Sequence, residues 1–320
     1  AGEAAGELPC RRAWGPALPA LGGASFLALA EITRRMAVGG GHCDVREAGA
    51  VPKEFAAICG TPARGREGQA LRVVFPPISP ATRLPPERWI WTLGVWATCA
   101  ALLLPAVRSA WEMFLHCRRR HGLCGFTYKL VFALLGVAGA GLLGEASVPL
   151  QADFWEVQAA AAQQKAAVSA TGGPELTAQS LLHLTCAGIM FVSLFAHGLL
   201  FVALQCLAAC QGRRGITRAS LCLKALAAAV VALSVIGVLP VLALAACPPR
   251  LCDPRACLYN LGGLQQRFAV AGVAGFLATY SLDIRADATR RAAASEDRAA
   301  ELTAVGPGAA GATGASVAAR

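Results

Sequence analysis

The fold is decided by the stretch LTAQSLLHLTCAGIMFVSLFAHGLLFVALQCLAACQG, residues 176–212, which contains no charged residue over 37 positions. A second charge-free stretch, of 25 residues, lies between Lys224 and Arg250. A membrane-spanning helix needs about 20 consecutive apolar residues, so both stretches are long enough to cross a bilayer. Only 15% of the 320 residues are charged, against about 25% in a typical soluble domain. The sequence therefore predicts a multi-pass membrane protein and argues against a disordered chain, a disulfide-rich secreted domain or an ordinary cytosolic enzyme.

We expect an all-α, polytopic membrane bundle with five clear membrane helices and a sixth near the beginning of the chain. The sixth is predicted over Ala13–Ala30, which is uncharged for 18 residues but is weakened by Pro16, Pro19, Gly22 and Gly23. Three tryptophans at the start of the first clear helix are expected at the bilayer interface, where aromatic rings are favoured. The five clear helices lie at or within Trp89–Val107, Leu130–Val148, Ser180–Ala209, Ala225–Ala246 and Leu264–Leu282.

These helices divide the chain into four regions. Residues 1–30 hold the sixth helix, residues 31–88 form a luminal loop, residues 89–283 form the membrane bundle, and residues 284–320 form a disordered cytosolic tail. The tail is rich in Ala and Gly and carries charge, a composition typical of low-complexity segments.

Orientation follows from the short loops, because Lys and Arg accumulate on the cytosolic side of a membrane. The loops that contain Arg118–Arg120 and Arg213–Arg218, together with the tail, are basic and alternate with two loops that carry fewer basic residues. We therefore place the basic loops in the cytosol and the other two in the lumen or outside. Residues 31–88 carry nine basic residues on the luminal side, but long loops constrain orientation weakly.

Five cysteines fall in the luminal loops, where an oxidising compartment allows disulfides. We expect no metal site, because the spacing of Cys117 and Cys124 beside His116 and His121 matches no common zinc finger. No cofactor is expected, since no phosphate loop or dinucleotide fingerprint occurs. The net charge of +10 is spread through loops without interleaved aromatic residues, which argues against nucleic acid as a partner. The disulfide candidates are Cys43, Cys59, Cys247, Cys252 and Cys257, and their pairing stays open.

Three ionisable residues at membrane depth, Glu145, His197 and Arg267, are candidates for a site, because such groups usually face the bundle interior or a functional cavity. Each also has a structural interpretation. His197 fits a core histidine bonded to a neighbouring helix, and Glu145 and Arg267 fit interfacial charges or an ion pair. The functional alternative is a luminal polar pocket that holds a lipid headgroup or acyl ester. Asp283 is interpreted as a helix-end residue, and we reject Ser79 as a nucleophile because no base is predicted beside it.

Specific motifs precede and enter the first clear helix. Cys59-Gly60-Thr61-Pro62 is followed by Phe75-Pro76-Pro77-Ile78-Ser79-Pro80 and then by Pro85-Pro86-Glu87-Arg88-Trp89-Ile90-Trp91. The prolines favour a stiff, extended segment at the membrane surface, and Arg88 is placed to anchor the helix end among headgroups. Together these motifs resemble the luminal signature of the FRAG/DRAM/SFK family, whose amino-terminal domain is of the CWH type, and they are most similar to its GPI-processing members.

The resemblance implies six helices and an integral membrane protein of the Golgi or endoplasmic reticulum that takes part in GPI-anchor lipid remodelling, in the reacylation of lyso-GPI. Whether the chain itself transfers the acyl group is left open. If it does, Glu145 and His197 are the catalytic candidates, as bases toward the lipid hydroxyl. Arg88, Gln266 and Arg267 are the candidates for lipid or headgroup binding. Further matches, within Cys59–Asp283, are Glu145, Ser193–His197, Cys252-Asp253 with Tyr259, and Phe276, Thr279 and Asp283.

The chain departs from the GPI-processing members at several polar positions. Thr92, Thr98 and Leu102 stand where those members tend to carry Arg and His, and Leu150 and Gln151 replace a His-Glu pair. These losses favour an alternative that resembles the DRAM and SFK branches: a non-enzymatic regulator of autophagy or lipid asymmetry, in a lysosomal or plasma membrane. Both functions imply a membrane lipid as ligand, a GPI-anchor lipid in the first case, and membrane proteins as further partners.

Overall fold

The computed structural model describes residues 16–40, 73–118, 125–151, 177–210, 217–246 and 256–304, and the regular elements within these ranges are all helices. Five helical stretches in this part are long and apolar enough to cross a membrane, and they overlap the five predicted helices. The prediction of an all-α membrane bundle is therefore confirmed, and the chain is an integral, multi-pass membrane protein. The five stretches are Glu87–Glu112, Tyr128–Ser147, Ala178–Leu207, Arg218–Val235 and Tyr259–Ala300.

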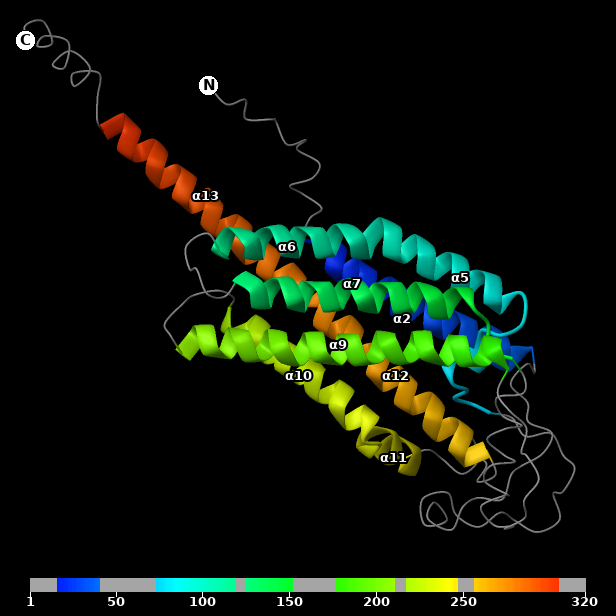
Figure 1. Cartoon of the computed structure of the whole chain (residues 1–320). Coiled ribbons are helices and arrows are strands. Elements are labelled where there is room, and N and C mark those ends of the chain that lie inside the picture. The colour runs from blue at the N-terminus through cyan, green and yellow to red at the C-terminus, as the bar shows by residue number, and fades with distance from the viewer. Residues whose placement is uncertain are drawn as a thin grey trace, which may run out of the picture.

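The helices form a bundle of long rods that alternate in direction along the chain (Figure 1). A helix of 20 residues is about 30 Å long, which is the thickness of the hydrocarbon core. The order is α2 (Leu18–Gly39), the short α4 (Ile78–Ala81), α5 (Glu87–Thr98), the π-helical turn η2 (Cys99–Leu103), α6 (Leu104–Arg118), α7 (Gly125–Ser147), α9 (Ala178–Cys210), α10 (Arg218–Val235), α11 (Val238–Ala245), α12 (Cys257–Ala278) and α13 (Tyr280–Ala304).

Helix α2 occupies the place of the sixth predicted helix, but it is shifted toward the carboxyl end. It covers Leu18–Gly39 instead of Ala13–Ala30 and packs against α12, α5 and η2. Its charged end is stabilised internally, because Glu31 forms ion pairs with Arg34 at 2.5 Å and with Arg35 at 2.9 Å. The helix therefore continues into the region expected to be a luminal loop, and these charges explain why α2 is less apolar than the five membrane helices.

The tryptophans of α5 divide between two environments. Trp89 and Trp96 are 56% and 47% exposed, so their rings are accessible to the bilayer interface predicted for them. Trp91, predicted to lie there too, is only 3% exposed. It follows Trp89 by two positions, and with 3.6 residues per turn it faces the opposite side of the helix. Its ring packs against Phe26 of α2, with centroids 5.5 Å apart.

Helix α10 begins earlier than the sequence predicts. Thr217 caps it by accepting a hydrogen bond from the backbone N–H of Ser220 at 3.2 Å, so the helix starts at Arg218 and includes Lys224, which we expected at the end of a cytosolic loop. Further along the predicted Ala225–Ala246 helix, Gly237 has φ of 85°, a left-handed conformation that glycine adopts without strain and that separates α10 from α11.

Helix α13 extends through the first part of the tail that was expected to be disordered, up to Ala304. The Ala-rich composition explains this, because Ala is the strongest helix former. Arg291 and Asp287 also pair across one helical turn at 2.7 Å. Figure 1 shows α13 continuing beyond the end of the bundle as a single rod.

Helix α5 begins at one end of the bundle, and α13 extends past the other (Figure 1). Leu84, just before α5, and Arg290, within α13, are both exposed. With the predicted orientation, Arg290→Cys should react with a membrane-impermeant maleimide when only the cytosolic face is accessible. Leu84→Cys should react only after the internal membranes are opened. Labelling of the unsubstituted chain gives the background from its own cysteines, and labelling of both variants from one face would contradict the arrangement.

Candidate functional site

The proline-rich segment from Phe75 to Ile78 lies across the first half of α12 and is held there through its backbone. The Phe75 N–H donates to Asn260 Oδ1 at 2.8 Å, and the Ile78 N–H donates to Gln266 Oε1 at 2.7 Å. Prolines leave few backbone donors in such a segment, and side chains of α12 bind two of those that remain. Gln266, predicted to bind a headgroup, therefore binds the protein's own chain.

Arg267 has the same role. Its guanidinium donates to the carbonyl oxygen of Pro76 at 2.5 Å and to that of Gly263 at 3.1 Å. Gly263 is required at this crossing, because a Cβ there would collide with the Phe75 carbonyl oxygen. Arg88, the third predicted headgroup residue, lies at the start of α5 with its guanidinium 5.5 Å from the centroid of the exposed Trp89 ring. Arg88 thus lies at the exposed edge of the bundle.

A buried polar cluster, called the luminal cluster below, consists of Ser79, Trp91, Glu145 and His183. Glu145 at the end of α7 is 6% exposed and His183 near the start of α9 is 2% exposed. His183 Nε2 lies 3.6 Å from Glu145 Oε1, and His183 Nδ1 lies 2.6 Å from the carbonyl oxygen of Val148. The indole N–H of Trp91 is buried beside the same carboxyl group. The structure therefore joins the predicted candidate Glu145 to a histidine that the sequence did not single out.

The Ser79 hydroxyl donates to Glu145 Oε1 at 3.3 Å, so a carboxyl group does lie beside this serine. The order of the groups nevertheless differs from that of a serine–histidine–acid triad, in which the histidine contacts the serine directly. Here the carboxyl group lies between the hydroxyl and His183. The arrangement suits a hydrogen-bonding site centred on Glu145 better than an activated serine nucleophile.

An ion pair between Lys224 and Asp283 lies toward the other end of the bundle. Their Nζ and Oδ2 atoms are 2.5 Å apart, and neither side chain is exposed. The ammonium group also donates to Ser220 Oγ at 2.8 Å and lies 4.7 Å from the centroid of the Tyr280 ring. Asp283, interpreted as a helix-end residue, is indeed in the first turn of α13, and it links this helix to α10.

His197 is also fully enclosed, at 1% exposure. Its Nδ1 lies 2.7 Å from the carbonyl oxygen of Val131, and its Nε2 lies 2.9 Å from the Tyr280 hydroxyl. Phe201 and Phe276 pack around the ring, with centroids 6.0 and 5.7 Å from it. Since both nitrogens have partners within the protein, this geometry favours the structural interpretation of His197 over a role as a base.

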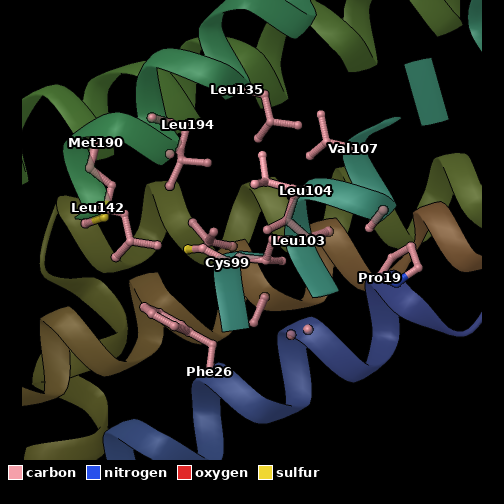
Figure 2. Close-up of a pocket in the computed structure, with 18 of the residues that line it drawn as sticks. Pro19, Phe26, Cys99, Leu103, Leu104, Val107, Leu135, Leu142, Met190 and Leu194 are labelled. Atoms are coloured by element: carbon pink, nitrogen blue, oxygen red, sulfur yellow. The ribbon is translucent and has the colours of Figure 1, made fainter. Parts of the chain in front are cut away.

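A cavity of about 360 Å³ lies between α2, η2, α6, α7, α9 and α12. Ligand sites usually have volumes of roughly 300–1,000 Å³, and no charged residue is among the described residues that line this one. Part of its wall is the π-helical turn η2, an irregularity that is frequent at functional sites. Figure 2 shows the side chains that surround the space, among them Phe26, Cys99, Leu103, Leu142, Met190 and Leu194.

The cavity extends between the two polar regions. Tyr280, the hydrogen-bond partner of His197, is one of its lining residues. On α7 the lining residue Leu142 precedes Glu145 by three positions, so the luminal cluster begins about 4.5 Å further along this helix. An elongated apolar ligand with a polar group at one end fits this arrangement, in which an apolar cavity is followed by a polar cluster.

Cys257, at the start of α12, is disulfide-bonded. A disulfide at this end of the bundle is expected where the compartment is oxidising. Within the described ranges, no group of three or more His, Cys, Asp or Glu side chains is placed to hold a metal ion. The other disulfide candidates, Cys43, Cys59, Cys247 and Cys252, lie outside the described residues, as does the Cys59–Pro62 motif.

No protein-family model, no curated protein and no solved structure matches the chain. A proposal for its function therefore has two sources, the resemblance carried by the motifs and the geometry of the cavity with its polar neighbours.

The buried ion pair gives a prediction for stability. Lys224→Met leaves the Asp283 carboxylate buried without its cation, and such a loss costs about 3–5 kcal/mol of unfolding free energy. The double variant Lys224→Met/Asp283→Leu removes both charges and should recover most of this loss. Thermal unfolding of the purified protein in detergent measures the loss of stability in the single and the double variant. Equal losses in the two variants would show that Lys224 and Asp283 do not stabilise each other.

Proposed function

We propose that the chain takes part in GPI-anchor lipid remodelling in the Golgi or endoplasmic reticulum, in the step that reacylates lyso-GPI. The resemblance of its motifs to the GPI-processing members of the FRAG/DRAM/SFK family supports the pathway. The cavity supports the handling of a lipid, because it is of ligand size, is lined by apolar side chains and lies inside the membrane bundle. The cavity is the observation that carries the proposal.

A lipid in this site has a defined direction. Its hydrocarbon chain lies among the apolar residues between α2, α7 and α9, where hydrophobic contact replaces contact with the bilayer. Its polar end lies toward Glu145 and His183, at the end of the bundle that we assign to the lumen. A polar site next to an apolar cavity matches the two halves of a lipid, and the lumen is the side on which GPI anchors are carried.

One observation favours the alternative function, a non-enzymatic regulator. His197, a candidate base, has both ring nitrogens bonded within the protein. If the chain transfers an acyl group, the base must therefore come from the luminal cluster. A regulator that binds a lipid without transferring an acyl group would use the same cavity, and it would fail in the rescue experiment below while still binding lipid.

Expression of the chain in cells that lack the lyso-GPI reacylation factor tests the function directly. We expect the chain to restore both the surface level of a GPI-anchored reporter and the saturated acyl chain in its anchor. Flow cytometry of the reporter and mass spectrometry of its lipid measure the two. A correctly localised chain that restores neither would contradict the proposal.

Filling the cavity tests whether the space is used. Gly139 lines the cavity and has open space where a Cβ would stand, so Gly139→Leu places a large side chain in the cavity without a clash at its Cβ. This variant should lose rescue and lipid binding while its expression level is kept. Gly188→Leu on α9 is the matched control, because Gly188 also has open space but is exposed and does not line the cavity. Full rescue by Gly139→Leu would show that the cavity is not needed.

A further inference from the structure

The two buried histidines of α9 differ in how their second ring nitrogen is satisfied. In both rings Nδ1 lies close to a carbonyl oxygen, at 2.6 Å in His183 and 2.7 Å in His197. A carbonyl oxygen only accepts hydrogen bonds, so Nδ1 carries a hydrogen in each ring. In a neutral ring Nε2 is then an acceptor. His197 Nε2 faces the Tyr280 hydroxyl, which donates to it at 2.9 Å, and no further proton is needed.

His183 Nε2 instead faces a carboxyl oxygen, Glu145 Oε1, at 3.6 Å. An ionised carboxylate is also an acceptor, so two acceptors would face each other in a buried site. An isolated carboxylate at 6% exposure is also costly. The two atoms are also too far apart for a hydrogen bond. With its hydrogen on Nδ1, His183 therefore presents an Nε2 that no group of the protein satisfies.

Three buried polar atoms of the luminal cluster have no hydrogen-bond partner: Glu145 Oε2, His183 Nε2 and the indole Nε1 of Trp91. Leaving such an atom unpaired costs about 1–3 kcal/mol, and unpaired atoms in native structures call for an explanation. These three provide a carboxyl acceptor, an indole donor and a ring nitrogen. Together they complement a group that both donates and accepts, such as a hydroxyl.

The apolar surroundings of the cluster connect it with the cavity. Trp91 packs on Phe26, which lines the cavity. Trp91 also belongs to one hydrophobic cluster with the lining residues Cys99, Leu142 and Met190. Trp91 and Glu145 do not line the cavity themselves, but they lie next to residues that do.

We propose that Trp91, Glu145 and His183 form a binding site for a free hydroxyl group on the glycerol of a single-chain lipid whose chain lies in the cavity. The position of the chain rests on the proposed function. The hydroxyl accepts a hydrogen bond from the indole N–H and donates one to Glu145 Oε2, and His183 Nε2 lies 3.6 Å from the other carboxyl oxygen. Ser79 keeps its own hydrogen bond to Oε1, which leaves Oε2 for the ligand.

Binding of two matched probes to the purified full chain tests the site. The probes are 1-palmitoyl lysophosphatidylcholine and its 2-deoxy analogue, which has the same chain and headgroup but lacks the hydroxyl. Hydrogen bonds to charged groups contribute about 1.5–3 kcal/mol, so the hydroxyl lipid should bind about 10- to 150-fold more tightly. Glu145→Gln and Trp91→Phe should each reduce this preference at least several-fold. Both variants should bind the 2-deoxy lipid as tightly as the unsubstituted chain does, and this unchanged affinity also shows that they fold.

Thr185→Ala is the matched control, because Thr185 lies on the same helix as His183 but is exposed and bonds only to the Leu181 carbonyl oxygen. It should keep the full preference. If both lipids bind equally well and Gly139→Leu abolishes both, the cavity binds lipid but the hydroxyl site is overturned. A preference that survives in Glu145→Gln and in Trp91→Phe also overturns the site. If neither lipid binds, the proposed function fails together with it.

Discussion

The hydrocarbon core of a bilayer offers no water to polar groups, so each one at that depth must find a partner inside the protein. The backbone meets this constraint by forming helices. Among the side chains, Lys224 meets it through Asp283, and His197 meets it through a carbonyl oxygen and Tyr280. The luminal cluster meets it only in part, because Glu145 and His183 keep buried atoms without a partner. Asp283 Oδ1 of the ion pair also lacks a hydrogen-bond partner. The luminal cluster differs because three side chains with such atoms, Trp91, Glu145 and His183, lie together in it.

The same constraint explains how the loop before α5 comes to be part of the bundle. Its prolines remove backbone donors, and α12 binds three of the polar groups that remain through Asn260, Gln266 and Arg267. The segment covers the luminal cluster, because Ser79 reaches Glu145 from it. The apolar cavity then lies on the other side of the cluster, enclosed by helices. A polar site held by a fixed segment and adjacent to an apolar space is suited to the end of a lipid.

The sequence predicted the fold well because the signal for membrane helices is composition over some 20 residues, and this survives without knowledge of contacts. The sequence predicted the ends of the helices less accurately. The ion pairs of Glu31 and the cap of Thr217 extended α2 and α10 beyond the apolar stretches.

The candidate site was predicted only in part. Glu145 stood out as a charge at membrane depth, but His183 is one polar residue in a long apolar helix, and only the packing of α7 against α9 shows its partner. Gln266 and Arg267 were selected for their polarity, and their partners are backbone groups about 190 positions away.

A lipid whose hydrocarbon chain lies in the cavity and whose polar end meets Glu145 should be visible directly in an experimental structure of the full chain in lipid nanodiscs, prepared with a single-chain lysolipid. We expect elongated density between α2, η2, α7 and α9, with its polar end within hydrogen-bond distance of Glu145 and Trp91. A cavity that is empty or closed by its own side chains, with lipid density only on the outer surface of the bundle, would contradict this expectation.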